Sequence, residues 1–76
     1  MNSELKEILR TITGFDESRL SKINDDDELN FLDSLQILNL IVNIEEQFKI
    51  SIEPEDIENM NRISDINNII NNKINQ

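Results

Sequence analysis

The side chain with the most distinctive chemical setting in this sequence is the hydroxyl of Ser34. It follows Asp33, which suits the N-cap position of an apolar helix that is predicted to begin there. A hydroxyl in the first turn of a helix lies at the positive end of the helix dipole, where backbone N–H groups favour a phosphate. No base in the chain is placed to activate this hydroxyl, so another protein must supply the activation. Taken alone, Asp-Ser-Leu is a short and common string that is typical of a helix cap followed by a small residue. We predict no catalytic residues in this chain.

The residue types that support most enzyme chemistry are missing. The chain of 76 residues has no cysteine and no histidine, which excludes thiolate and imidazole metal ligands and Ser–His or Cys–His nucleophile pairs. The acidic run at residues 25–28 is similar to the start of an EF-hand calcium loop, but Asn30 stands where that loop needs glycine and Gln36 where it needs glutamate. We predict no metal site and a protein that is not an enzyme.

The negative charge is concentrated in the middle of the chain. The formal net charge is −9, and residues 25–58 hold eleven acidic residues and one basic residue, Lys49. Such a surface repels the phosphates of nucleic acids and anionic lipids and attracts basic protein surfaces. We expect protein partners with basic docking surfaces, and neither nucleic acid nor membrane as a partner.

The length and the hydropathy pattern limit the organisation of the chain. A chain of this length buries one small core, so residues 1–76 are predicted to form a single domain. No apolar run approaches the roughly 20 residues that span a bilayer, and the N-terminal residues lack a charged-then-apolar signal region. We expect a stand-alone, cytoplasmic, monomeric protein.

Helical spacing of apolar residues predicts the first element. Apolar residues recur on one helix face in the segment 3–13, at Leu5, Ile8, Leu9 and Ile12. Asn2 or Ser3 can cap the start of this helix, and Gly14 suits its left-handed end. The following residues, 15–32, show no long period and predict a long loop with room for a short helical turn at 16–21.

Three further helices are predicted after this loop. The second begins after Asp33 and continues to Phe48, and a short third helix, 54–59, begins at Pro54. The last helix begins near Ser64 or Asp65, because isoleucines follow at helical spacing, at Ile66, Ile69, Ile70 and Ile74. The predicted fold class is all-α: a small four-helix bundle of three longer helices and one short one, with a long loop between helices one and two.

The second helix carries apolar residues on two faces. At about 100° per residue, one broad arc contains Ile37, Leu38, Leu40, Ile41, Ile44 and Phe48. Leu35 and Val42 fall on the opposite side, with Asn39 and Glu46 beside them. This second stripe predicts a docking surface for a partner, although single aliphatic residues on a surface are also normal.

The motifs of this region together resemble an acyl carrier protein. The resemblance covers nearly the whole chain and is carried by Leu-Asp-Ser-Leu at 32–35, Ile-Glu-Glu-Gln-Phe at 44–48 and Ile-Ser-Ile-Glu-Pro-Glu-Asp-Ile at 50–57. Phe31 departs from the family pattern, which usually has glycine there, and Asn39 stands where many fatty-acid carriers have an acidic residue.

The resemblance implies a role for particular residues. Ser34 would carry 4′-phosphopantetheine, attached covalently from coenzyme A. Docking positions would be Asp33, Leu35, Asn39, Val42, Glu45 and Glu46. An apolar cleft that shelters the acyl chain would be bordered by Ile44, Ile52, Ile57 and Met60.

The resemblance also implies a function and partners. The chain would hold acyl intermediates as thioesters on the phosphopantetheine arm, for lipid, polyketide or related biosynthesis. Its partners would be a phosphopantetheinyl transferase and enzymes that transfer or ligate acyl groups. Two alternatives stay open: a peptidyl or aminoacyl carrier, including a D-alanyl carrier, and an unmodified acidic helical adaptor that binds a basic partner.

Overall fold

The computed structural model describes residues 2–75, and most of these residues lie in helices. In chain order the elements are α1 Ser3–Thr13, α2 Glu17–Leu20, the 3-10 helix η1 Leu29–Phe31, α3 Ser34–Phe48, α4 Pro54–Glu58 and α5 Ile63–Ile74. This confirms the prediction of a helical fold with three longer helices. The predicted loop between the first two long helices contains two short helices, α2 and η1. The predicted domain, 1–76, extends one residue beyond the described range at each end.

The first helix begins and ends where its capping residues predict. The side chain of Asn2 accepts a hydrogen bond from the backbone N–H of Leu5 at 2.7 Å. Gly14 adopts a left-handed conformation with φ 72°, and its N–H donates to the carbonyl of Arg10 at 2.8 Å. Both ends of α1 are therefore set by local chemistry, independently of the core.

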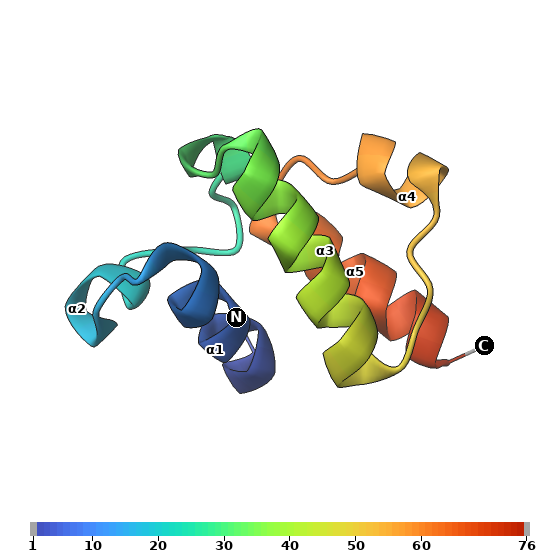
Figure 1. Cartoon of the computed structure of the whole chain (residues 1–76), viewed down its shortest axis with the longest axis horizontal. Helices are drawn as coiled ribbons and strands as arrows, with labels where there is room; N and C mark the ends of the chain where they lie inside the picture. Colours follow the sequence, from blue (N-terminus) through green and yellow to red (C-terminus); the bar gives the residue numbers. More distant parts are fainter. Residues whose placement is uncertain (1, 76) are drawn as a thin grey trace.

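The hydrophobic core joins the three long helices. Figure 1 shows α3 crossing the middle of the molecule, with α1 and α2 on one side and α4 on the other. The fully or almost fully buried side chains come from α1, α2, α3 and α5: Leu5, Leu9, Leu20, Leu40, Ile44, Ile63, Ile66 and Ile70. Burial of these side chains supplies the main free energy that holds the helices together.

The structure corrects the predicted position of Leu38. It was placed on the buried arc of α3, but its side chain is exposed. Around the helix axis, Leu38 lies about 60° from buried Ile41 and only about 40° from exposed Val42. The buried arc is narrower than predicted and ends at Ile41, so Leu38 belongs to the outer face.

The last helix begins one residue earlier than the predicted start at Ser64 or Asp65. Ile63 is its first residue and is fully buried. The Oδ2 atom of Asp65 accepts hydrogen bonds from the backbone N–H groups of Asn61 and Arg62, at 3.0 and 2.9 Å. These two bonds cap the helix from within its first turn, which the sequence reading missed.

The short helix α4 contributes no buried residue. Its predicted start at Pro54 is confirmed, and it ends at Glu58, one residue before the predicted end. On its N-terminal side, the backbone N–H of Ile52 donates to Glu45 Oε2 at 2.9 Å. On the α5 side, Lys73 Nζ lies 2.8 Å from Asp56 Oδ2.

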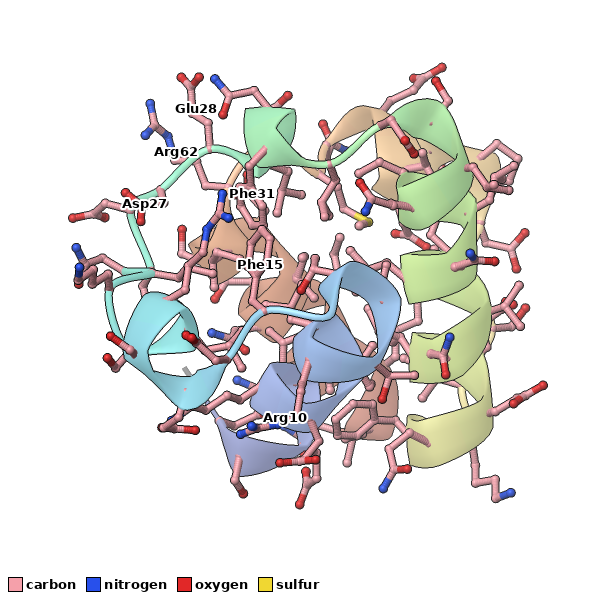
Figure 2. The ribbon with its side chains drawn as sticks, turned by 60° about the vertical axis from the view of Figure 1, so that its left-hand side comes forward. Arg10, Phe15, Asp27, Glu28, Phe31 and Arg62 are labelled. Carbon is pink, nitrogen blue, oxygen red and sulfur yellow. The ribbon has the colours of Figure 1, made fainter. Side chains whose placement is uncertain are left out.

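Backbone hydrogen bonds join the segment before α3 to the segment before α5. The N–H of Leu29 donates to the carbonyl of Asn61 at 2.9 Å, and the N–H of Ile63 donates to the carbonyl of Asp27 at 3.1 Å. Between them, Glu28 and Arg62 form an isolated antiparallel bridge. Figure 2 shows Arg62 and Glu28 next to each other at this edge. The start of α3 is thereby tied to the start of α5.

An aromatic pair anchors the same segment to the end of α1. The rings of Phe15 and Phe31 lie with their centroids 6.3 Å apart, and the Arg19 guanidinium carbon lies 3.8 Å from the centroid of Phe15 (Figure 2). Phe31 is the residue that stands where the resembled family usually has glycine. Its side chain fills space between the loop and the α1–α2 corner.

None of the helices within residues 2–75 combines the length and the apolar character needed to cross a membrane.

Candidate functional site

Asp33 fixes the start of α3 through a reciprocal pair of hydrogen bonds. Its Oδ1 atom accepts from the backbone N–H of Gln36 at 2.8 Å, and Gln36 Oε1 accepts from the backbone N–H of Asp33 at 3.0 Å. The residue itself is extended, with φ −85° and ψ 178°. This capping box satisfies two backbone donors. The side chain of the next residue, Ser34, is therefore not needed to cap the helix.

Ser34 is the first residue of α3 and is exposed to solvent. Leu32, two residues earlier, is buried and holds the preceding chain onto the core. The carboxylate of Asp33 is directed to the backbone of Gln36. The serine therefore stands at the edge of a firmly anchored segment with its hydroxyl open to an approaching protein.

The electrostatic setting at Ser34 has two opposing parts. The first backbone N–H groups of a helix have no acceptor within the helix and carry the positive end of its dipole, which favours a phosphate at Ser34. The middle of the chain carries most of the acidic residues. A phosphate at this position would be favoured locally while the surrounding field attracts basic protein surfaces.

The comparison with known families decides what this arrangement is. The family model described as the phosphopantetheine attachment site matches residues 3–70, which include α1 to α4 and the larger part of α5. The chain belongs to this family. Its domain is the site of a covalently attached 4′-phosphopantetheine, and family members are typically carriers without catalytic activity of their own.

The residues at the start of α3 fit this group. An exposed hydroxyl is the chemistry that a phosphodiester linkage requires, and Ser34 supplies one at the first residue of a helix of 15 residues. The backbone N–H of Gln36 donates to Asp33, while those of Ser34 and Leu35 lie in the same first turn and have no acceptor within the helix. Within residues 2–75, no cluster of three or more acidic side chains is arranged to hold a metal ion.

The outer face of α3 is apolar, and we call it the docking face. Leu35, Leu38 and Val42 are 66%, 59% and 50% exposed. Asn39 and Glu46 are exposed on the same side of the helix. Four of the predicted docking residues therefore lie on one side of α3 together with Leu38: Leu35, Asn39, Val42 and Glu46. Asp33, also predicted, is exposed and immediately precedes this helix.

Glu45 takes a different direction from the other predicted docking residues. It is half-buried, and its carboxylate accepts the hydrogen bond from the backbone N–H of Ile52. This contact turns Glu45 towards the segment that leads into α4. This contact could not be predicted from residue spacing, because a bond to the backbone of a loop has no periodic pattern.

The four predicted cleft residues lie at different depths. Ile44 is fully buried and Ile52 is buried at the edge of the core. Met60 packs against the core from outside it, whereas Ile57 on α4 is 37% exposed. The structure places two of them inside the packed core and two at its surface.

The sequence analysis missed a groove beside the first turn of α3. Its lining comes from three segments: Glu28, Leu29, Asn30, Leu32, Ile37, Met60, Asn61 and Arg62. Of these, only Met60 was predicted to border a cleft. The other positions come together because the segments around η1 and around Asn61 pair through backbone bonds, and a pairing of two irregular segments is not readable from residue spacing.

Proposed function

We propose that residues 1–76 form an acyl carrier domain and that Ser34 carries the 4′-phosphopantetheine. The proposal is supported by one observation above all: the matched region contains an exposed serine at the first residue of a capped, well-anchored helix. When bound, the group supplies a terminal thiol that holds an acyl group as a thioester. The helices α1, α3, α4 and α5 make up the four-helix framework, and α2 is an accessory turn within the connecting segment.

The chain's own residues present the attachment point and do not activate it. Asp33 uses its carboxylate to cap α3, and this fixes the position of the Ser34 backbone. When the Ser34 oxygen bonds to the phosphorus next to the pantetheine in coenzyme A, the P–O bond to the adenosine side breaks and 3′,5′-adenosine bisphosphate leaves. The hydroxyl proton goes to a base of the transferase. The partners implied are therefore a phosphopantetheinyl transferase and the enzymes that load and use the acyl group.

The docking face is proposed to be the surface that these partners contact. Its apolar residues Leu35, Leu38 and Val42 are exposed, although burial would be favourable for each of them. Acidic residues surround this part of the chain, so partners with basic surfaces are attracted to it. The acidic middle segment and Leu32 before the motif favour an acyl carrier over a peptidyl or aminoacyl carrier.

Incubation with coenzyme A and a broad-specificity phosphopantetheinyl transferase tests the attachment site. Intact-mass measurement is expected to show the addition of one phosphopantetheine group to the wild type and none to Ser34→Ala. Ser18→Ala removes another exposed serine, on α2, and should gain the full mass. A folded wild type that gains no mass, or gains it at another residue, would overturn the proposal and favour the unmodified adaptor.

The same assay, followed over time, tests the docking face. Val42→Asp and Leu38→Asp should slow the transfer by about tenfold, which equals about 1.4 kcal/mol, because a carboxylate in an apolar contact must be desolvated. Gln47→Asp adds the same charge to an exposed position on another side of α3 and should transfer at the wild-type rate. Equal rates for all three variants would remove this face from the contact.

A further inference from the structure

The groove beside the first turn of α3 has the size of a small-molecule site. Its volume is about 590 Å³, within the range that ligand sites in proteins cover. Buried Leu29 and Leu32 belong to its lining. Exposed polar residues form its rim: Glu28, Asn30, Asn61 and Arg62. The groove combines a small apolar base with a polar surround.

The groove lies within reach of Ser34. Ile37, which lines it, is three positions after Ser34, and residues at this spacing are neighbours on the surface of a helix. Two other grooves touch α3 further along its length, one at Asn43 and Gln47 and one at its C-terminal cap, Lys49. Of these three grooves, the polar-rimmed one lies nearest to Ser34 along α3, and the arm can reach it by folding back onto the protein.

The polar rim is held in place by hydrogen bonds. Arg62 Nη1 donates to the carbonyl of Asp26 at 2.7 Å, and Arg62 Nη2 lies 3.6 Å from Glu28 Oε1. The backbone of Asn61 is fixed on both sides, since its carbonyl accepts from Leu29 and its N–H donates to Asp65. The side-chain amide of Asn61 can therefore meet a ligand at small conformational cost.

The core side chains of α3 and α5 are closely packed in this structure. Leu40, Ile44 and Ile63 are all fully buried. A chain that entered between them would have to displace closely packed side chains, and such overpacking is destabilising. The space that the fold offers next to Ser34 is the groove, whose rim can donate hydrogen bonds from amide and guanidinium groups.

We infer that the preferred cargo is a short acyl group with a hydroxyl or carbonyl close to the thioester, and that this cargo rests in the groove. The inference depends on the proposed function, because the cargo reaches the groove from Ser34. The apolar base contacts the short carbon chain, and Asn30, Asn61 or Arg62 donates a hydrogen bond to the polar substituent. A long saturated chain is disfavoured, since it would cover the polar rim without satisfying it.

The test compares three loaded forms of the intact chain. Butyryl, β-hydroxybutyryl and octanoyl groups are attached through a broad-specificity phosphopantetheinyl transferase and the corresponding coenzyme A thioesters, and the mass is checked first. Backbone and side-chain amide NMR shifts and the rate of thioester cleavage by hydroxylamine are then measured. The β-hydroxybutyryl form should shift the amides of Asn30 and Asn61 and should be cleaved about fivefold more slowly than the butyryl form, as expected for one hydrogen bond.

A matched pair of variants assigns the effect to the groove. Asn61→Ala should remove the difference between β-hydroxybutyryl and butyryl, while Asn68→Ala, an exposed asparagine of α5 outside the groove, should keep it. Slowest cleavage of the octanoyl form, with shifts at Leu40, Ile44 and Ile63, would overturn the inference. Absence of shifts in the groove for both short groups would also overturn it. Failure to gain mass at Ser34 would instead contradict the proposed function.

Discussion

The α1–α2 corner and the α4 segment are held to the same molecule in different ways. In the corner, α1 contributes buried Leu5, Ile8 and Leu9, and α2 contributes buried Leu20. In the α4 segment, residues 52–60, no residue of the helix itself is buried. Only Ile52 and Met60, on either side of the helix, pack on the core, and polar contacts supply the other ties. Burial is shared among many side chains, whereas a few polar contacts can be broken one at a time. The corner is therefore expected to open only with global unfolding, and α4 to open locally.

Polar contacts also differ between the two regions. In the corner, the carboxylate of Glu17 accepts hydrogen bonds from Lys6 and from Arg10, and these ties add to the buried contacts. In the α4 segment, the carboxylate of Asp56 pairs with Lys73 and also accepts from the backbone N–H of Glu53 at 2.9 Å. One carboxylate reinforces a region that is already packed, and the other holds a helix that has little packing of its own.

The largest expected effect comes from removing buried volume in the corner. Leu9→Ala should lower the free energy of unfolding by about 3 kcal/mol, because it deletes a fully buried side chain and leaves a cavity. Ile57→Ala, on α4, should lower it by about 1 kcal/mol or less, since this side chain is partly exposed. Urea unfolding followed by circular dichroism measures both. Equal losses would show that α4 is packed as firmly as the corner.

A smaller loss of stability is expected when acid protonates the carboxylates of Glu17 and Asp56. The hydrogen bond from Lys6 is the main cause that lowers the pKa of Glu17 below its ordinary 4.5, and that from Lys73 lowers the pKa of Asp56 below 3.8. A lowered pKa contributes stability above the ordinary value, and this contribution is lost as the pH falls through the folded pKa. The stabilisation of wild type over Glu17→Gln should thus be full near neutral pH and vanish in acid.

Melting temperatures measured between about pH 6 and about pH 3 check this pH dependence. Lys73→Gln, which removes the partner of Asp56, should lose its difference from wild type as the pH falls through the lowered pKa of Asp56. The exposed Glu46→Gln on α3 serves as the control for a change of charge alone. A difference between wild type and Glu17→Gln that persists unchanged in acid would contradict an ionic role for Glu17.

The smallest expected effect is confined to α4. Lys73→Gln should raise the rate of amide hydrogen exchange in α4 by about threefold, the scale of a partly exposed ion pair, and leave exchange in α1 unchanged. Exchange measured by NMR on the intact chain separates the two helices. Lys22→Gln, at an exposed position after α2, controls for the loss of a positive charge. Faster exchange in α1 and α4 alike would mean that the ion pair stabilises the whole fold.

Local capping chemistry explains which parts of the fold could be predicted. Both ends of α1 follow from Asn2 and Gly14, and the start of α3 follows from Asp33. Leu38 was placed wrongly because periodicity gives its angle around α3 but not which neighbouring elements cover that angle. Burial of a residue at the edge of an arc depends on tertiary packing.

Only part of the candidate site could be predicted from the sequence. The position of Ser34 at the start of α3 is readable from Asp33 and the helix that follows. The groove beside it was not predicted, because Asn30 and Asn61 are thirty-one positions apart and meet through backbone bonds between irregular segments. Apart from the Arg62 side chain, which contacts Asp26 and Glu28, the bonds of this pairing join backbone atoms. Residue spacing therefore does not predict it.

The bridge between Glu28 and Arg62 also determines how the molecule bears mechanical load. With the group attached at Ser34, as proposed above, an enzyme that draws it towards its own catalytic centre would exert tension on Ser34 and on the chain just before it. Through the bonds to Asn61 and Ile63, that tension would pass to α5, where Ile63, Ile66 and Ile70 are buried in the core. The force would then be distributed over the packed core, and the first turn of α3 would stay intact.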